Sequence, residues 1–232
     1  MGNLLLSYLN NRMLEIEAEK KGAKTDSGPV ITISREVGCN GVKLATQIAE
    51  HLNSKSQGTS WKVISKEVFY QSAKELKMQP DQVRKTLHQT EKFTFDDILK
   101  AFSDKNYKTD ITIRKTMKRV ILQIATDGYC IIVGRAGHII AKGIKNAIHI
   151  RLVAPVEYRI NTIIQNKNFN RDEAISFIER VEKERTQFRK SILKDNPSNE
   201  MFDITINRTA FGDKEIIELI EFAGMKKNIF KL

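Results

Sequence analysis

The sequence predicts an α/β fold in which a parallel five-stranded sheet is flanked by helices in three layers. Short runs of apolar, β-branched residues alternate with longer segments of helical periodicity, as the crossover connections of a parallel sheet require. One run, Tyr129 to Val133, is apolar throughout, which is typical of a strand buried on both faces. The expected strands are residues 30–34, 61–64, 129–133, 147–153 and 203–207.

Composition limits the class of protein and of partner. The 232 residues suffice for one α/β domain with an appendage. Lys and Arg outnumber Asp and Glu by 39 to 28, so an anionic partner is expected: a nucleotide, a nucleic acid or an acidic lipid. No apolar run approaches the ~20 residues that span a bilayer, and no secretory leader is visible. The prediction is a cytoplasmic protein with no membrane partner.

The cysteines and histidines do not predict a metal site. Cys39 and Cys130 give no disulfide framework, and the 4 histidines have no metal-ligand spacing, so no metal ligands are assigned. Cys39 lies just before a predicted helix. It is interpreted as a small residue that fits a turn, and the alternative is a thiol whose pKa is lowered by the helix N-terminus.

The chain before the first strand is predicted to lie outside the core domain. Residues 1–21 have apolar side chains at helical spacing, which indicates an amphipathic helix. Residues 22–29 are rich in turn formers and are interpreted as a linker. We therefore expect residues 1–29 to be an N-terminal helix and linker that packs on the domain or, in a homodimer, on a second copy.

The first strand is followed by a loop that contains Gly38 and Gly41, and then by a helix predicted over residues 42–53. The N-terminus of such a helix has unpaired, convergent backbone N–H groups, and the helix dipole adds positive charge there. Glycine allows the positive φ or close approach that a loop around an anion needs. The pattern therefore predicts an anion-binding loop.

This loop departs from the P-loop pattern G-x-x-x-x-G-K-[ST], in which the Lys contacts the β/γ-phosphates and the hydroxyl contacts Mg²⁺. Aligned on Gly41, the chain has Glu36 at the first glycine, Val42 at the lysine and Lys43 at the hydroxyl residue. Lys43 lies one residue further along the helix, about 100° away from the lysine position. An ordinary strand-loop-helix connection is the alternative interpretation.

The remaining chain supplies the crossover helices. Residues 64–108 are predicted to form a helical insertion, and a helix follows over residues 109–127. Pro155 is expected to start a helix, and residues 170–173 have the spacing of a capping box before another. The last helix is predicted over residues 213–225.

Cations are expected at the carboxyl ends of the strands, where parallel sheets bind ligands. Arg135, directly after a buried strand, has the bidentate guanidinium that suits a phosphate, and Lys66 is a second candidate contact. Residues 180–190 are dense in cations and precede a loop over residues 194–199, so they are interpreted as a lid over a transferring phosphate. Solvated or salt-bridged surface cations are the alternative.

The order of these pieces resembles the nucleoside monophosphate kinases, specifically the cytidylate kinase-like family. The resemblance covers residues 30–226 and rests on four stretches: Ile31 to Glu36 with Gly38 and Gly41, Ile131 to Ala136, the cations Arg185 and Arg189, and Asp203 to Asn207. It implies a P-loop kinase fold, with residues 64–108 as the acceptor-binding insertion and residues 167–200 as the lid region.

The resemblance also implies a reaction and its residues. ATP, with Mg²⁺, would donate its γ-phosphate to a nucleoside monophosphate, nominally CMP or dCMP. Arg35 or Lys43 would be the donor-side cation, and Arg185 and Arg189 would be catalytic cations of the lid. The loop residues expected to bind ATP are Ser34, Arg35, Gly38, Cys39, Asn40, Gly41, Val42 and Lys43. The residues expected to bind the acceptor are Lys66, Gly134, Arg135 and Asp203.

Two departures from the family pattern keep rival functions open. Cytidylate kinases carry Gly-Lys in the loop and Gly-Arg-Asp after the third strand, where this chain has Val42 and Ala136. A nucleotide-binding protein without turnover would explain the missing lysine. A nucleic-acid-binding module would explain the positive charge, but the chain has no recognised nucleic-acid motif, so nucleic acid is not the expected partner.

Overall fold

The computed structural model describes residues 29–56, 60–65, 111–193 and 200–230, without the side chains of residues 111–117. Several predictions therefore lie outside the described residues. They are the N-terminal helix and linker up to residue 28, all but the first residues of the 64–108 insertion, Lys66 within it, and the 194–199 loop.

The chain divides into two compact units, Pro29–Val63 with Tyr129–Leu232, and Met1–Gly28 with Ile64–Gly128. The described helix of the second unit is α6 (Ile111–Asp127), close to the predicted bounds. It ends at Gly128, which has a φ of 76° and donates its N–H to the Ile124 carbonyl at 3.2 Å. Glycine has no Cβ to oppose this left-handed conformation, so it is a common residue at helix ends.

The first unit contains the predicted five-stranded parallel sheet. The strand order is β2-β3-β1-β4-β5, so β1 is central. Ile33 of β1 lies beside Val133 of β3 and Ile150 of β4, which brings the carboxyl ends of these strands to one edge. The strands are β1 (Val30–Arg35), β2 (Lys62–Ile64), β3 (Cys130–Val133), β4 (Ala147–Val153) and β5 (Ile204–Asn207).

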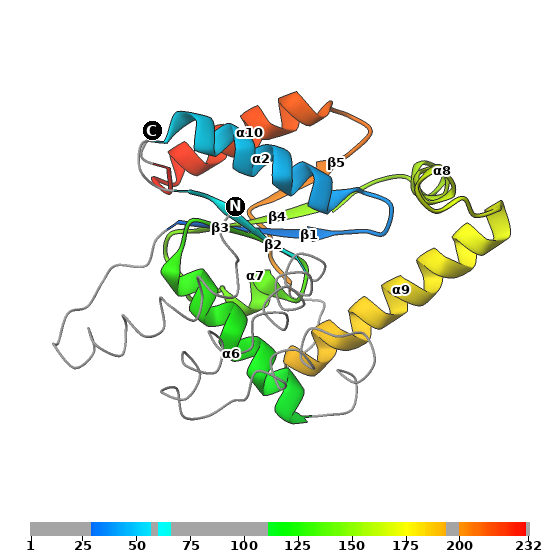
Figure 1. Ribbon diagram of the computed structural model, residues 1–232, viewed down its shortest axis with the longest axis horizontal. Helices are drawn as coiled ribbons and strands as arrows, with labels where there is room; N and C mark the ends of the chain where they lie inside the picture. Colours follow the sequence, from blue (N-terminus) through cyan, green and yellow to red (C-terminus); the bar gives the residue numbers. More distant parts are fainter. Residues whose placement is uncertain (1–28, 57–59, 66–110, 194–199, 231–232) are drawn as a thin grey trace, which may run out of the picture. The chain divides into compact units, whose positions relative to one another are not determined.

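Helices cover both faces of this sheet, which confirms the three-layer architecture (Figure 1). The helices α2 (Gly41–Lys55) and α10 (Asp213–Lys226) lie side by side on one face. A short helix on the other face, α7 (Gly137–Ile140), was not predicted. Gly137 packs so closely that a Cβ there would lie 2.7 Å from Ile132 Cγ2. Four residues are too few to show a helical period, so sequence periodicity could not reveal α7.

The layer between α2, α10 and the sheet forms the main apolar core. Its helical side chains include Leu44, Ile48 and Leu52 from α2 and Ile216 and Ile220 from α10, all almost completely buried. Burying one such side chain stabilises the fold by about 1.5–3 kcal/mol. The start of α2, and with it the loop that precedes it, is therefore held by packing.

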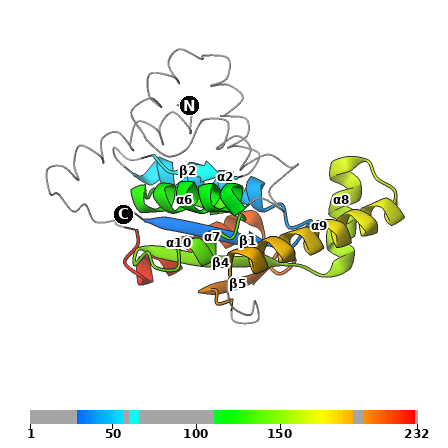
Figure 2. The same ribbon diagram turned by 90° about the horizontal axis from the view of Figure 1, so that it is seen from below.

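Two further helices, α8 (Val156–Lys167) and α9 (Arg171–Ile192), form a pair at the end of β4 (Figure 2). The predicted capping box begins α9: Asn170 Oδ1 accepts from the Glu173 N–H at 2.9 Å, and the Glu173 carboxylate accepts from the Asn170 N–H at 2.8 Å. Pro155 was predicted to start α8 and is its N-cap residue, so the helix begins one position later, at Val156. None of the described helices is long and apolar enough to cross a membrane.

The α8–α9 pair has a small apolar core of its own. One member of this core, Val37, comes from the β1–α2 loop (residues 36–40), and the other buried members are Ile160, Ile163, Ala174 and Ile178. The loop therefore packs against α8 and α9 through a buried side chain. This arrangement places the two helices beside the predicted anion-binding loop.

Candidate functional site

Within the described part of the chain, the N-terminus of α2 lacks a side-chain cap, which favours the binding of an anion. Asn40, its N-cap residue, has a φ of 48°, and its side chain makes no capping hydrogen bond among the described residues. The first turn of α2 also has no acidic residue. The N–H groups at this end therefore have neither a capping oxygen nor a carboxylate to offset the helix dipole.

Gly38 shapes the β1–α2 loop by packing as well as by conformation. Its φ is +94°, and a Cβ at this position would lie 2.7 Å from Arg159 Cα and 2.8 Å from the Arg159 carbonyl oxygen. Backbone atoms cannot move aside as a flexible side chain can. This glycine, predicted from the sequence to let the loop wrap around an anion, thus also allows α8 to approach the loop.

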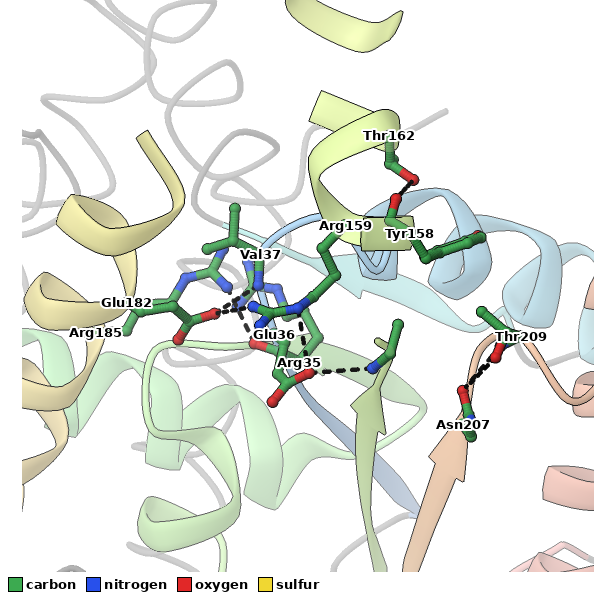
Figure 3. Close-up of polar contacts among 11 residues, drawn as sticks. Arg35, Glu36, Val37, Tyr158, Arg159, Thr162, Glu182, Arg185, Asn207 and Thr209 are labelled. Atoms are coloured by element: carbon green, nitrogen blue, oxygen red, sulfur yellow. Dashed lines mark hydrogen bonds and ion pairs between the residues drawn. The ribbon is translucent and has the colours of Figure 1, made fainter. Parts of the chain in front are cut away.

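The amino-terminal half of the loop is tied down by hydrogen bonds (Figure 3). The Glu36 N–H donates to the Leu152 carbonyl at 3.0 Å, and Glu36 Oε2 accepts from the Ala154 N–H at 3.1 Å. The Val37 N–H donates to Glu182 Oε1 of α9 at 2.6 Å. In the carboxyl-terminal half, which leads into the start of α2, the Cys39 N–H donates to the Glu36 carbonyl at 3.3 Å and Asn40 Oδ1 accepts from Asn166 Nδ2 of α8 at 3.0 Å.

Arg159 of α8 lies between two carboxylates beside this loop (Figure 3). Its Nε is 3.6 Å from Glu36 Oε2, and its Nη1 is 3.8 Å from Glu182 Oε1. Both distances are longer than a hydrogen bond. The Arg159 side chain is only 15% exposed, and its Nε has no hydrogen-bond partner among the described residues. Arg159 is thus a mostly buried cation with spare donor capacity.

Sequence reasoning missed Arg159, Glu36 and Glu182 as site residues. Glu182 was part of a charge-dense helix, where its partner 145 residues away could not be foreseen. Arg159 did offer a weak signal, because it lies in the first turns of the helix that follows the fourth strand, at the ligand-binding edge of the sheet. A single arginine on a helix is too common for that signal to stand out.

The side chain of Arg35 connects the loop to the end of β3. A Cβ on Gly41 would lie 3.1 Å from Arg35 Cγ, and a Cβ on Gly134 would overlap Arg35 Nη1. The Arg35 carbonyl oxygen accepts from Arg185 Nη1 of α9 at 3.0 Å. The structure thus brings together four of the predicted site residues, from three separate stretches of sequence.

The other predicted lid and acceptor cations already have contacts. Arg189 Nε donates to Glu200 Oε1 at 2.9 Å, and Arg135 lies over the Phe188 ring, 6.0 Å from its centroid. Glu200 Oε2 is 3.3 Å from His138 Nε2. Burial lowers the pKa of His138 to about 4, so this imidazole is neutral at pH 7. The charge of Arg189 is therefore offset by a buried carboxylate.

Two predicted residues lie apart from this cluster. The Lys43 side chain is 71% exposed and its Nζ is 4.0 Å from Asp213 Oδ2, so it faces the start of α10. Asp203 precedes β5 at the amino end of the strand, where its carboxylate accepts from the His149 N–H and from Lys227 Nζ, each at 2.7 Å. Asp203 is therefore not at the carboxyl edge, where the other candidates lie.

The remaining predicted loop residues have mainly packing environments. Ser34 lies beside Arg151 of β4, and Val42 packs against the main apolar core. Cys39 is fully buried, and this burial, with Glu36 nearby, raises the pKa of its thiol to about 11. The structure thus favours a small buried residue at this position and contradicts the alternative of a lowered pKa.

One further buried cation, Arg208, was not predicted. It follows β5, and its Nη2 donates to Asp213 Oδ1 at 2.5 Å. Its side chain is 6% exposed, and its Nε and Nη1 have no partner among the described residues. Its charge, like that of Arg159, acts on the Cys39 thiol in the β1–α2 loop. Arg159 and Arg208 each lower the pKa of this thiol, and the Glu36 carboxylate raises it.

Comparison with known proteins decides the family. A family model described as the cytidylate kinase-like family matches residues 30–210, more than half of the chain. The chain belongs to the cytidylate kinase-like family. The matched residues include the sheet, the β1–α2 loop, α8 and α9. The family indicates a phosphotransferase of the kinase type. No match is found among curated proteins.

Comparison with solved structures finds the fold of this cytidylate kinase-like chain in another protein. A protein from Eubacterium ventriosum, described as uncharacterized, superposes with a TM-score of 0.57 at 17% identity, over 84% of this chain and 97% of that chain. TT1252 from Thermus thermophilus gives a TM-score of 0.41 at 16% identity, over 87% of this chain and 98% of that chain. The first match shows that the fold occurs in a protein of low sequence identity to this chain.

Proposed function

We propose that this cytidylate kinase-like protein transfers the γ-phosphate of ATP to a nucleoside monophosphate, nominally CMP or dCMP. The observation that supports this most is the uncapped N-terminus of α2, surrounded by arginines from β1, α8 and α9. Phosphoryl transfer depends mainly on positioning and on neutralising charge spread over phosphate oxygens. A helix N-terminus and convergent guanidinium groups supply both.

On the donor side, the residues present fit the phosphates of ATP. The backbone N–H groups from Gly38 to Val42 would hold these phosphates, and the partnerless Nε of Arg159 offers a charge that Val42 lacks. Arg35 is the second donor-side cation, whereas Lys43 faces α10. Among the described residues, no group of three or more His, Cys, Asp or Glu could hold a metal ion, so Mg²⁺ would enter with the nucleotide.

On the acceptor side, we assign Gly134, Arg135 and Lys66 to the acceptor phosphate and Arg185 to the lid. Arg135 follows β3 at the carboxyl edge, and Arg185 is joined to the Arg35 carbonyl. Arg189 would join the lid cations on release from Glu200. Asp203 is left out of this assignment because Lys227 and the His149 N–H engage its carboxylate at the other end of β5.

Nucleotide binding without turnover is the second candidate function. Two observations favour it: Val42 stands where a P-loop has its lysine, and Glu182 puts a carboxylate beside the loop. Under this alternative the same site would bind ATP, and no phosphate would move.

The test is phosphate transfer from ATP·Mg²⁺ across a panel of CMP, dCMP, UMP, AMP and GMP, with ATP binding measured in parallel. We expect transfer to one or two pyrimidine acceptors, loss of transfer in Arg135→Ala, and retention in Lys226→Ala, a change to an exposed lysine of α10 that lies over the Phe222 ring. ATP binding without transfer to any acceptor would establish the second candidate. Absence of ATP binding would overturn both.

A further inference from the structure

The carboxylate of Glu182 lies where an incoming phosphate would meet the same positive groups. Glu182 Oε1 accepts from the Val37 N–H at 2.6 Å, a short, charge-assisted hydrogen bond. The same oxygen is 3.8 Å from Arg159 Nη1. Figure 3 shows the two side chains converging on the amino-terminal half of the β1–α2 loop from α8 and α9.

The attachment of α9 to the loop does not require the negative charge of Glu182. One helical turn further along α9, Arg185 donates to the Arg35 carbonyl at 3.0 Å. The Val37 side chain is buried in the α8–α9 core. A neutral amide oxygen at position 182 can still accept from the Val37 N–H, in a weaker hydrogen bond without charge assistance. The charge is therefore separable from the hydrogen bond, and its effect on the site can be considered alone.

The charge of Glu182 also acts on Arg159. This guanidinium is shared between Glu36 and Glu182 at distances longer than hydrogen bonds, and its Nε has no partner among the described residues. Two carboxylates thus neutralise a mostly buried cation without saturating its donors. Such a cation can be taken over by a ligand with better-placed oxygens, but the ligand must overcome the charge already present.

We propose that Glu182 is an internal anion that competes with the phosphates of the ligand for Arg159 and so weakens phosphate binding at the loop. The inference rests on the proposed function, because the ligand is taken to be a nucleoside polyphosphate. Glu182 is a positioning residue: it holds Arg159 beside the loop and keeps α9 attached to Val37. The phosphates displace only its ion pair with Arg159, and its hydrogen bond to the loop remains.

The experiment compares calorimetric binding of ATP·Mg²⁺ and of inorganic tripolyphosphate to the full chain and to three variants. Glu182→Gln keeps an acceptor for the Val37 N–H and removes the charge, whereas Glu182→Ala removes both. Glu179→Gln is the matched control, because Glu179 is exposed on the same helix and the net charge changes equally. We expect Glu182→Gln to bind both ligands about tenfold more tightly than Glu179→Gln, with a gain that shrinks as salt rises.

The outcomes separate this inference from the proposed function. If the wild type binds ATP and Glu182→Gln binds no more tightly than Glu179→Gln, the inference is overturned and the proposed function stands. If only Glu182→Gln binds ATP, the inference is supported in its strongest form. If neither the wild type nor any variant binds either ligand, both are overturned.

A folding control accompanies these measurements. Glu182→Ala should melt at a lower temperature than Glu182→Gln, since it alone leaves the Val37 N–H without its acceptor. If Glu182→Gln itself fails to fold, Glu36→Gln removes the other charge next to Arg159 while keeping an acceptor for the Ala154 N–H. It should then raise the affinity in the same direction, and an unchanged affinity would contradict the inference.

Discussion

The helices α2 and α10 lie on the same face of the sheet, and each follows the carboxyl end of a strand, yet they begin differently (Figure 1). The first turn of α10 contains two acids. Asp213 pairs with Arg208, and Glu215 Oε2 accepts from the Gly212 N–H at 2.8 Å. The first turn of α2 has no acid, and the side chain of its N-cap residue, Asn40, makes no capping bond among the described residues.

This difference distinguishes a helix start that supplies its own carboxylates from one that has none. Each helix N-terminus carries a partial positive charge that an anion stabilises. The α10 helix supplies its own carboxylates, whereas α2 lacks them, and a missing cap costs a helix about 1 kcal/mol. The buried side chains of Leu44, Ile48 and Leu52 make that cost tolerable. Four changes would break or sharpen the comparison.

Gly38→Ala should have the largest effect, because it disturbs the β1–α2 loop, which leads into the uncapped N-terminus of α2. The φ of +94° and the overlap with Arg159 backbone atoms together should lower the free energy of unfolding by about 3 kcal/mol and abolish ATP binding. Urea unfolding measures the loss. Gly143→Ala is the control, since nothing lies within 4 Å of its Cβ position, and it should change stability little. Equal effects of the two changes would contradict this account of the loop.

Asp213→Asn should come second, by removing the countercharge of the buried Arg208 at the start of α10. We expect the free energy of unfolding at pH 7 to fall by about 2 kcal/mol, less than for a fully buried pair because Asp213 is 29% exposed. Glu157→Gln, which breaks the exposed pair with Arg171, is the contrast and should change the free energy of unfolding little.

The same pair makes stability depend on pH. The hydrogen bond from Arg208 holds the pKa of the Asp213 carboxyl below its ordinary value of 3.8. The unfolded chain therefore takes up this proton at a higher pH than the folded one. The stabilisation is fully present above about pH 5 and is lost as pH falls through the folded pKa. Urea unfolding of the wild type and Asp213→Asn should converge below about pH 4, and a constant difference would refute this linkage.

Lys43→Glu would make the start of α2 resemble that of α10. Lys43 is the third residue of α2, the position that Glu215 occupies in α10. The new carboxylate should lower the affinity for ATP·Mg²⁺ about tenfold, and it should change the free energy of unfolding little, because repulsion from Asp213 offsets the gain from the helix dipole. Lys43→Gln separates loss of the lysine from gain of the acid. If both variants bind ATP equally, the N-terminus of α2 is not where the phosphates bind.

Glu215→Ala comes last because it should lower stability alone and have no effect on ligand binding. It opens the start of α10 by removing the acceptor of the Gly212 N–H. We expect the free energy of unfolding to fall by about 1 kcal/mol in a thermal or urea experiment, while calorimetry shows unchanged ATP affinity. Weakened ATP binding in this variant would mean that the two helix starts are not independent.

Most of the sheet could be predicted from the sequence because its signals are local. The fourth strand was predicted over residues 147–153 and is Ala147–Val153. The capping box at residues 170–173 was predicted from spacing and is present in both of its hydrogen bonds. The helical period alone also predicted that Lys43 points away from the P-loop lysine position. In the structure Lys43 faces Asp213. These features depend on residues within one or two turns of each other.

The candidate site was predicted only in part. Gly38, Arg35, Gly134 and Arg185 were chosen from local signals or resemblance, and the structure places them around one loop. Asp203 was assigned to the acceptor through the resemblance, although a residue that precedes a parallel strand lies at the end away from the ligand edge. The position of Asp203 at the start of the strand was the better guide to the edge of the sheet at which it lies.

What the sequence determined by itself is the layered α/β fold and the strand-loop-helix element, because apolar period, glycine and capping residues act over short distances. Only the tertiary structure decided which charges meet there. Glu182, Arg159 and Arg208 are far from the β1–α2 loop in sequence, and each resembles an ordinary surface residue until the sheet, α8 and α9 bring them to Val37 and Cys39. Electrostatic partners are chosen by distance in space, and no local pattern encodes that distance.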